Sequence, residues 1–517
     1  MAKGRSTVLI ASLIWGSSIL LSRFIGLIKD GVLGRILGGG EAFDIYTTAF
    51  TLPDFLTYLL AGSALSLVFI QIFNDHIARD DEDGAWQTFS DISVFLTVVL
   101  AVFIPCAWWL TPLINQTIIA PGFGPDQLEE LNRLVRIMLP ATLFHMIGGL
   151  ISATLQARDQ HALPAMSGLV YTTGIILGGL ILGPTMGAEG FAWGVLAGSI
   201  LGAFGLPFIG ALRHGLRWRP RLKFSNPSFR AYFIRSLPVM LGVSIIVLDD
   251  MFLKQQASFL AEGSAATLMM GKTLMRVPMG IFGFAAGAAA YPTLTRLIGQ
   301  GDREGAYVLV SRSVRRMLVL CFGAQVGMSA AGPEIARVIY GHRLLAGQPT
   351  EVGISMAILS IGLWAWAAQL IVSRGFYAQG KTWLPTLIGT TVTVLGYPIY
   401  ILARQWGGIY ALSLTSAAMI SVYVIALIVF LRRDFQSTAD GYVGYFARTV
   451  PAVLIGLLAG YLARLALPPV QIVVDGALYG IIGAAVYVAA AAVLGVEEVR
   501  EVGEMVSERV KRRLGRG

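Results

Sequence analysis

The chain has 517 residues, of which 55% are hydrophobic and 13% are charged, and its mean hydropathy is +0.70. Soluble globular proteins carry about 25% charged residues, so this composition excludes a soluble globule and indicates a polytopic membrane protein. The formal net charge of +9 does not indicate nucleic-acid binding, because the positive charges concentrate in alternate loops between apolar segments.

Apolar runs long enough to cross a membrane, about 20 residues each, recur from residue 8 to residue 495. We count about fourteen, which predicts an all-α membrane protein. The positive-inside rule assigns the loops rich in Lys and Arg to the cytoplasm, and both termini then lie there too. The two clearest basic clusters consist of Arg213, Arg217, Arg219, Arg221, Lys223 and Arg230, and of Arg296, Arg303, Arg312, Arg315 and Arg316.

Ionisable residues fall in or beside the first two apolar segments, namely Arg23, Lys29, Asp30, Arg35, Asp44 and Asp54. Ionisable groups at membrane depth cost several kcal/mol unless they pair or line a water-filled cavity, so they mark a polar pathway. Arg23 and Lys29 are six residues apart, about 120° around a helix, and a break at Gly26 would change that angle. A structural salt-bridge network that includes Asp44 is the alternative interpretation.

Two sequence matches at one offset indicate an internal duplication. Gly84-Ala85-Trp86 corresponds to Gly305-Ala306-Tyr307, and Leu163-Pro164-Ala165 corresponds to Leu384-Pro385-Thr386, each pair 221 positions apart. Each match precedes an apolar segment at the same place in its half. We therefore predict two six-helix lobes as parallel repeats around a central cavity, which favours a transporter that works by rocking the lobes. The predicted parts are an N-terminal lobe at 1–220, a C-terminal lobe at 221–435, and two further helices at 436–495.

The seventh apolar segment contains Asp249 and Asp250, with Lys254 one turn later. One interpretation is an internally compensated ion pair, and the other is a cation or gating site. No acidic partner for a sodium site occurs from Leu384 to Ile401, so coupling to protons or to the membrane potential is equally allowed.

The rest of the sequence gives few signs of other chemistry. Cys106 and Cys321 lie in apolar segments and are expected to behave as small apolar residues. No metal cluster, Walker loop or nucleophile elbow occurs, so we expect no cofactor and no ATP-driven step by this chain alone. The C-terminal stretch 496–517 is basic at its end, which predicts a cytoplasmic helix against anionic headgroups or a solvated tail.

The stretch Ser22 to Asp30, followed by Asp44 and Leu52-Pro53, resembles the start of the MurJ (MviN) family of lipid II flippases. That family opens with Ser-Arg-x-x-Gly-x-x-Arg-Asp, followed by Asp and Leu-Pro. Further matches follow in the family's order: Ala120-Pro121-Gly122-Phe123, Leu139-Pro140, Leu163-Pro164-Ala165, Ser258-Phe259-Leu260, Pro278 with Gly280 and Gly283, and Gly375-Phe376-Tyr377 before Lys381-Thr382.

The resemblance implies a multi-pass flippase of the bacterial cytoplasmic membrane, within the multidrug/oligosaccharidyl-lipid/polysaccharide (MOP) superfamily. It implies lipid II as the substrate and a role in peptidoglycan biosynthesis and cell shape. Moving a lipid-linked pyrophosphate needs a cationic cavity that replaces phosphate hydration. On this reading Arg23 binds phosphate, while Lys29 and Asp30 assist it or form a gating pair.

The chain departs from the family pattern at three positions. Thr57 and Thr273 stand where many members have arginines, and Lys29 replaces an arginine and so loses bidentate phosphate geometry. Lys272 and Arg276 lie next to Thr273 and one turn from it, so we expect them to restore positive charge to the cavity.

Four other functions stay open. The two threonines would suit a flippase for a different polyprenyl-pyrophosphate oligosaccharide. A multidrug antiporter of the same superfamily should have an acidic cavity, which the cations argue against. A polyprenyl-dependent glycosyltransferase using Asp249 and Asp250 would need these carboxylates near an aqueous face. An inactive scaffold is compatible with the incomplete set of family arginines.

Overall fold

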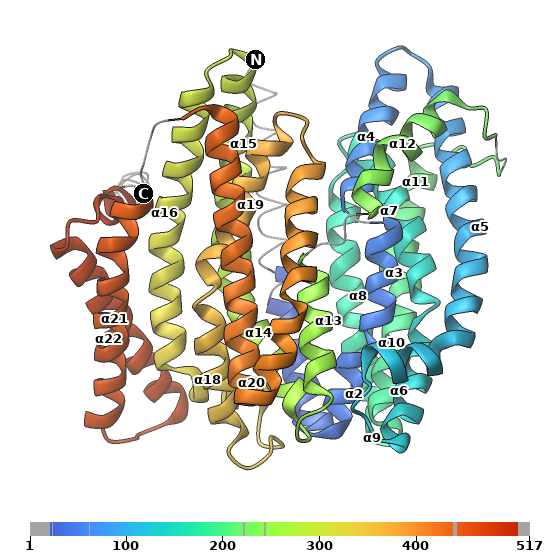
Figure 1. The fold of residues 1–517 in the computed structure, drawn as a ribbon. Helices are drawn as coiled ribbons and strands as arrows, with labels where there is room; N and C mark the ends of the chain where they lie inside the picture. The colour runs from blue at the N-terminus through green and yellow to red at the C-terminus, as the bar shows by residue number, and fades with distance from the viewer. Residues whose placement is uncertain are drawn as a thin grey trace, which may run out of the picture. The chain divides into compact units, whose positions relative to one another are not determined.

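The computed structural model describes residues 21–22, 24–61, 63–220, 223–241, 245–437 and 442–504. Every regular element within these ranges is a helix, and none is a β-strand (Figure 1). The predicted all-α class is therefore confirmed.

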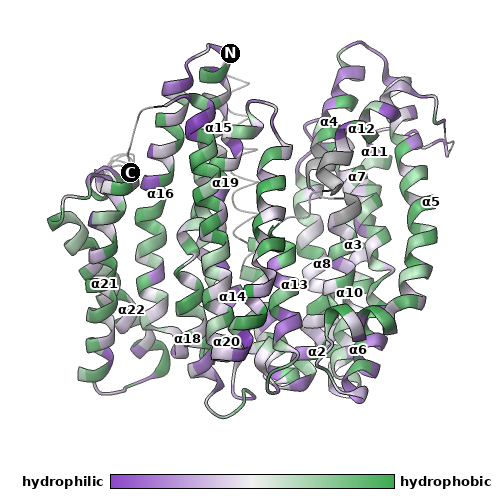
Figure 2. Cartoon of the chain, viewed as in Figure 1, coloured by the Kyte–Doolittle hydropathy of each residue, from purple (hydrophilic) through white to green (hydrophobic). Residues whose placement is uncertain are grey.

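The long helices have the composition of membrane spans. In the described part of the chain, seven helices are long and apolar enough to cross a membrane, and counting each of two bent helix pairs as one span brings the number to nine. Figure 2 shows hydrophobic residues along the middle of helices such as α5 (Glu82–Ile114) and α22 (Ile472–Val493), with hydrophilic residues gathered near helix ends. The protein is thus multi-pass, while the count of about fourteen stays a prediction.

The chain forms two compact units. Unit 1 consists of Met1–Ala266 with Ile339–Leu344, and unit 2 consists of Thr267–Val338 with Leu345–Gly517. Helices α12 and α13 pack against α3 and other helices of unit 1. The lobes predicted at 1–220 and 221–435 stay a prediction.

Unit 1 has an aromatic core in which α4, α5 and α7 meet. Phe73 and Phe89 each contact the Trp86 ring edge to face, with ring centroids 5.5 and 5.7 Å away. Besides a helix through 24–37, the unit contains α2 (Glu41–Ala49), α3 (Thr51–Ala61), α4 (Ser63–Ile77), α5 (Glu82–Ile114), η1 (Asn115–Ile119), α6 (Pro125–Met138), α7 (Ala141–Ala157), α8 (Ala162–Ile181), α9 (Gly183–Met186), α10 (Ala188–Gly198), η2 (Ser199–Gly205), α11 (Leu206–Arg213), α12 (Pro227–Leu241) and α13 (Ile245–Ala257).

Unit 2 is built around α16, which packs against α15, α19, α21 and α22. Helix α20 is two helices joined at a kink, where Gly407 and Gly408 leave helical geometry. The elements are α14 (Ser264–Pro278), η3 (Met279–Gly283), α15 (Phe284–Gly299), α16 (Arg303–Ala330), α17 (Gly332–Tyr340), α18 (Gln348–Ser360), α19 (Leu363–Tyr377), α20 (Trp383–Phe435), α21 (Tyr442–Ala466) and α22 (Ile472–Val493). The first residues of α14 and the last of α17 belong to unit 1.

The backbone repeats at the offset that the sequence predicts. Helices α4, α5 and α8 begin 221 positions before α15, α16 and α20. Left-handed backbone positions, with φ between 53° and 81°, recur at the same offset. The four pairs are Asp80 and Gly301, Asp159 and Gly380, Gly187 and Gly408, and Gly215 and Gln436.

The helix caps repeat as well. The Asp81 carboxylate accepts a hydrogen bond from the Gly84 N–H at 2.9 Å, and the Asp302 carboxylate accepts one from the Gly305 N–H at 2.8 Å. A Cβ on either glycine would lie about 2 Å from its capping carboxylate. Only glycine therefore fits at these two positions of the matched motifs. These parallels give the duplication a physical basis in turn and cap geometry.

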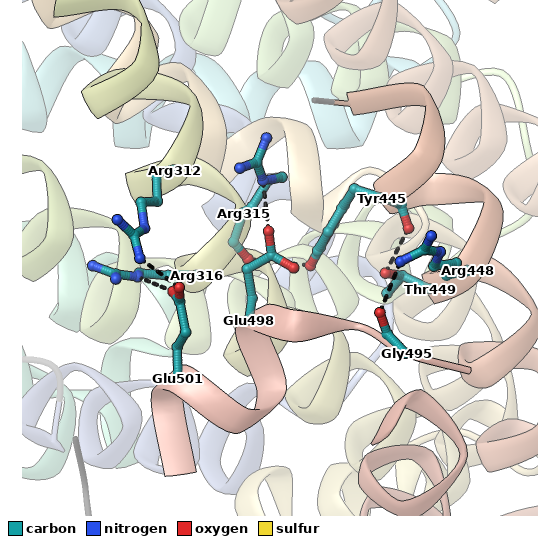
Figure 3. A network of polar contacts seen from close by, with 9 residues as sticks. All are labelled: Arg312, Arg315, Arg316, Tyr445, Arg448, Thr449, Gly495, Glu498 and Glu501. Carbon is teal, nitrogen blue, oxygen red and sulfur yellow. Dashed lines mark hydrogen bonds and ion pairs between the residues drawn. The ribbon is translucent and has the colours of Figure 1, made fainter. Parts of the chain in front are cut away.

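The C-terminal segment docks on α16 through ion pairs. Glu501 accepts from Arg312 Nη2 at 2.5 Å and from Arg316 Nε at 2.6 Å, while Glu498 accepts from Arg315 Nε at 2.6 Å (Figure 3). The Arg448 guanidinium also donates to the Gly495 carbonyl at 2.9 Å. Residues 497–504 thus form a helix that ion pairs attach to α16. Residues 505–517 lie outside the described part of the chain. Binding of the tail to lipid headgroups stays a prediction.

We predict that Gly408→Ala and Gly187→Ala each destabilise the protein by about 1–3 kcal/mol, because an L-residue is strained at these positive φ angles. No atom lies within 4 Å of the Cβ that either change would add, so the backbone conformation is the sole cost. Thermal unfolding in detergent should show lower midpoints. Gly149→Ala in α7, which also adds its Cβ to open space, is the matched control and should leave the midpoint unchanged or raise it. Equal midpoints for all three variants would contradict this account.

The hydrogen bonds from Arg312 and Arg316 lower the pKa of Glu501 from 4.5 to about 2. A lowered pKa means that docking is stabilised above pH 4.5 and that this stabilisation is lost as pH falls through about 2. Proteolytic protection of residues 496–504 should therefore not change between pH 8 and pH 5. Glu501→Gln should reduce protection throughout that range, and pH-dependent protection in the wild type would exclude the carboxylate as the anchor.

Candidate functional site

Two cations share one aromatic ring inside unit 2. The Lys272 ammonium lies 5.3 Å and the Arg276 guanidinium 5.8 Å from the centroid of the Trp366 ring. Lys272 and Arg276 are one turn apart on α14 because of their i, i+4 spacing, and Trp366 faces them from α19. The structure therefore brings together the two cations that the sequence singled out in this region.

The surroundings of these cations are unusual for lysine. Lys272 is only 1% exposed, and Trp366 is equally buried. The face of an indole attracts a cation by about 0.5–2 kcal/mol, which offsets part of the cost of removing the charge from water. The Trp366 Nε1 has no hydrogen-bond partner in the described structure.

The cations are specific to the second copy of the duplication. At the offset of 221, Lys272, Arg276 and Trp366 correspond to Thr51, Phe55 and His145 of unit 1. The His145 ring instead contacts the Tyr171 ring edge to face, at 4.8 Å between centroids. Unit 2 thus carries two cations and an indole ring at positions where unit 1 has a threonine, a phenylalanine and a histidine.

Lys29 and Asp30 form an ion pair with each other in unit 1, with 3.1 Å between Nζ and Oδ1. Their helix lies close to the end of α17, where a Cβ on Gly31 would come within 2.8 Å of the Ile339 carbonyl oxygen. The pair is compatible with a gate or with a structural contact. The expected salt-bridge network with Asp44 does not include these two residues, because Asp44 has other partners.

Asp44 has an anchoring geometry. Its buried carboxylate accepts hydrogen bonds from the Gly263 N–H at 2.7 Å and the Ala266 N–H at 2.5 Å, at the turn that begins α14. A carboxylate at a helix N-terminus satisfies N–H groups that have no partner within the helix. Substrate binding by Asp44 stays a prediction, and the geometry gives this side chain a structural function as well.

The charged group of α13 is inside unit 1. Asp249 and Lys254 are buried and Asp250 is half-buried. Within the residues that the structure describes, no group of three or more His, Cys, Asp or Glu side chains could hold a metal ion. A gating function or a monovalent ion site at these three residues stays a prediction.

The remaining sequence predictions concern Arg23, Thr57 and Thr273. Arg23 lies outside the described residues. The Thr57 hydroxyl donates to the Pro53 carbonyl at 2.8 Å, so it closes a bond within its own helix. Thr273 is half-buried beside Lys272. Nothing in the sequence indicates that Trp366 contacts Lys272 and Arg276.

The family model described as "Lipid II flippase MurJ" matches residues 33–473. This chain belongs to the lipid II flippase MurJ family. Among the similar MurJ sequences, the probable lipid II flippase of Rhizobium tropici is 24% identical over 402 residues, which cover 74% of each chain.

Solved structures show that the fold is also that of the MurJ family. "Lipid II flippase MurJ, inward closed conformation" is similar with a TM-score of 0.77 at 16% identity, covering 95% of this chain and 99% of that chain. An inward-facing multidrug resistance MATE transporter of the MOP superfamily has a TM-score of 0.65 at 14% identity, covering 80% and 94%. The family predicted from the sequence is confirmed, and the chain is a transporter rather than an enzyme.

We predict that Asp44→Ala destabilises this MurJ family member by about 1–3 kcal/mol, because it leaves two backbone N–H groups without their acceptor. The measurement is the thermal unfolding midpoint in detergent. Glu129→Ala, which removes an exposed carboxylate with a 3.8 Å ion pair, is the control and should change stability little. An unchanged midpoint for Asp44→Ala would refute the anchoring function.

Proposed function

We propose that this chain flips lipid II from the cytoplasmic to the periplasmic leaflet of the bacterial cytoplasmic membrane, with both of its termini in the cytoplasm. Membership of the MurJ family supports the substrate. The single observation that carries the proposal is the pair of cations, Lys272 and Arg276, on the buried Trp366 ring.

The chemistry of the substrate explains this choice of residues. Lipid II is a large lipid-linked pyrophosphate, so a protein that moves it through a bilayer must replace the hydration of the phosphates. Charge-assisted hydrogen bonds from guanidinium and ammonium groups do this. Arg23, Lys272 and Arg276 bind the pyrophosphate, while Lys29, Asp30 and Asp44 hold the surrounding geometry or gate it.

Transport proceeds by alternating access in this proposal, with one lobe rocking against the other. The two repeats, which share helix starts and turn positions, support this choice. Asp249, Asp250 and Lys254 are the groups through which an ion gradient or the membrane potential acts. Charges inside a membrane helix respond to both.

A flippase for another polyprenyl-pyrophosphate oligosaccharide is the second candidate. Thr57 and Thr273, at positions where many family members have arginines, are the observation that favours it. Such a protein would keep the cationic contacts and differ in the sugar that it accepts. Competition between lipid II and other pyrophosphate-linked sugars separates the two candidates.

The test is complementation in bacteria depleted of their own lipid II flippase, with lipid II exposure at the periplasmic face as the measurement. The wild-type chain should restore exposure. Arg23→Ala and the double variant Lys272→Ala/Arg276→Ala should lower it by about tenfold or more, because each removes charge-assisted phosphate contacts.

Arg337→Ala, which removes an exposed arginine from α17, is the control for loss of positive charge. Membrane expression of every variant is matched by immunoblot. A well-expressed wild type that restores no exposure would exclude lipid II as the substrate. Full activity of the double variant would exclude the cluster of Lys272, Arg276 and Trp366, here called the Trp366 platform, as the phosphate site.

A further inference from the structure

Arg374 lies on the face of α19 that packs against α15. Its guanidinium carbon is 5.9 Å from the centroid of the Tyr291 ring. Gly287, one turn before Tyr291, leaves room for the guanidinium, since a Cβ there would lie 3.0 Å from the Arg374 Cζ. The guanidinium therefore lies against α15, where it contacts the Tyr291 ring and fills the space that Gly287 leaves open.

This arginine has no acceptor within the described part of the protein. None of the described residues places a carboxylate within ion-pair distance of Arg374 or accepts a hydrogen bond from its side chain. The nearby Tyr291 hydroxyl has no hydrogen-bond partner among the described residues either, and Arg374 is half-buried. A guanidinium has five N–H donors, and leaving them unsatisfied away from water is costly.

In unit 1 the equivalent pair of helices packs without these two side chains. At the offset of 221, Arg374 corresponds to Ala153 and Tyr291 corresponds to Ile70. In unit 1 both belong to apolar packing where α4 meets α7, the equivalent of the contact between α15 and α19. Unit 2 thus has a cation and an aromatic hydroxyl where its sister copy has an ordinary apolar contact.

The exposed edge of this guanidinium suits one class of ligand. An arginine stacked on an aromatic ring keeps its in-plane N–H groups free for bidentate bonds to phosphate or carboxylate. Arg374 is in the last turn of α19, eight residues or about 12 Å along the helix from Trp366. An anion that leaves the Trp366 platform along α19 would meet Arg374 next.

We propose that Arg374 and Tyr291 form a second phosphate-binding site in unit 2, which takes the headgroup phosphate of the transported lipid at a different stage from Lys272 and Arg276. This inference rests on the proposed function for the identity of the lipid. The phosphate chemistry is shared with bulk phospholipids, so the experiment includes both sources.

The experiment measures binding of undecaprenyl pyrophosphate to the purified full chain in detergent, with undecaprenol as the ligand without phosphate. Arg374→Ala should weaken binding of the pyrophosphate lipid by about tenfold and leave undecaprenol unchanged. Arg374→Lys should weaken it less, because the charge stays but the bidentate geometry is lost. Tyr291→Ile, which restores the residue of the sister copy, should weaken it by a smaller factor.

Folding is controlled by the choice of variants, since alanine and isoleucine already occupy these positions in unit 1. Arg337→Ala is the charge control and should bind as the wild type does. The second arm adds phosphatidylglycerol as a competitor at the concentration of the pyrophosphate lipid. Weak competition supports the transported lipid as the ligand, and equal competition overturns that assignment in favour of bulk lipid.

The outcomes separate this inference from the proposed function. Wild-type affinity in Arg374→Ala, with weakened binding in Lys272→Ala/Arg276→Ala, would overturn the second site and leave the proposed function standing. If the wild type bound undecaprenyl pyrophosphate no better than undecaprenol, the proposed function itself would fail.

Discussion

The cost of placing charge in a low-dielectric interior is the constraint on which this structure depends. A cation or carboxylate at membrane depth needs a partner, because no water is there to solvate it. In several places the partner is an opposite charge, as in Lys29 with Asp30 or Arg464 with Glu334 at 2.7 Å. In unit 2 it includes an aromatic ring, as for Lys272 and Arg276 on Trp366. Ion pairs inside the chain fix local structure, and an aromatic ring attracts a cation without neutralising its charge.

The duplication makes this contrast visible within one molecule. The two copies share turn positions, helix starts and aspartate caps, so their backbones meet similar demands. Their side chains differ at the places that bear charge: Thr51, Phe55 and Ala153 in one copy stand where Lys272, Arg276 and Arg374 stand in the other. The charged side chains thus differ on a shared backbone, which is the pattern expected when sites rather than folds determine activity.

Much of the fold could be predicted from the sequence because its signals are strong and local. Apolar runs and charge density indicate a helical membrane protein, and glycine after an aspartate cap gives the repeat a fixed offset.

The site is harder to predict because its contacts join residues that are far apart in sequence. The i, i+4 spacing of Lys272 and Arg276 suggested a shared face, but nothing near them indicated Trp366. The charge of Asp44 and its place in the family motif single it out, but the N–H groups that it accepts from are more than 200 residues away in the sequence. The basic residues at the end of the tail dominate its sequence pattern, whereas the contacts that dock it on α16 come from Glu498 and Glu501.

The constant offset has a consequence for the history of the gene. Four left-handed turns, spread from residue 80 to residue 215, recur at one spacing, so the two halves have gained and lost equal numbers of residues over that length. Connecting loops are normally where insertions accumulate most freely. Because the corresponding connections of the two halves lie at matched positions, they are natural crossover points for building chimaeric chains.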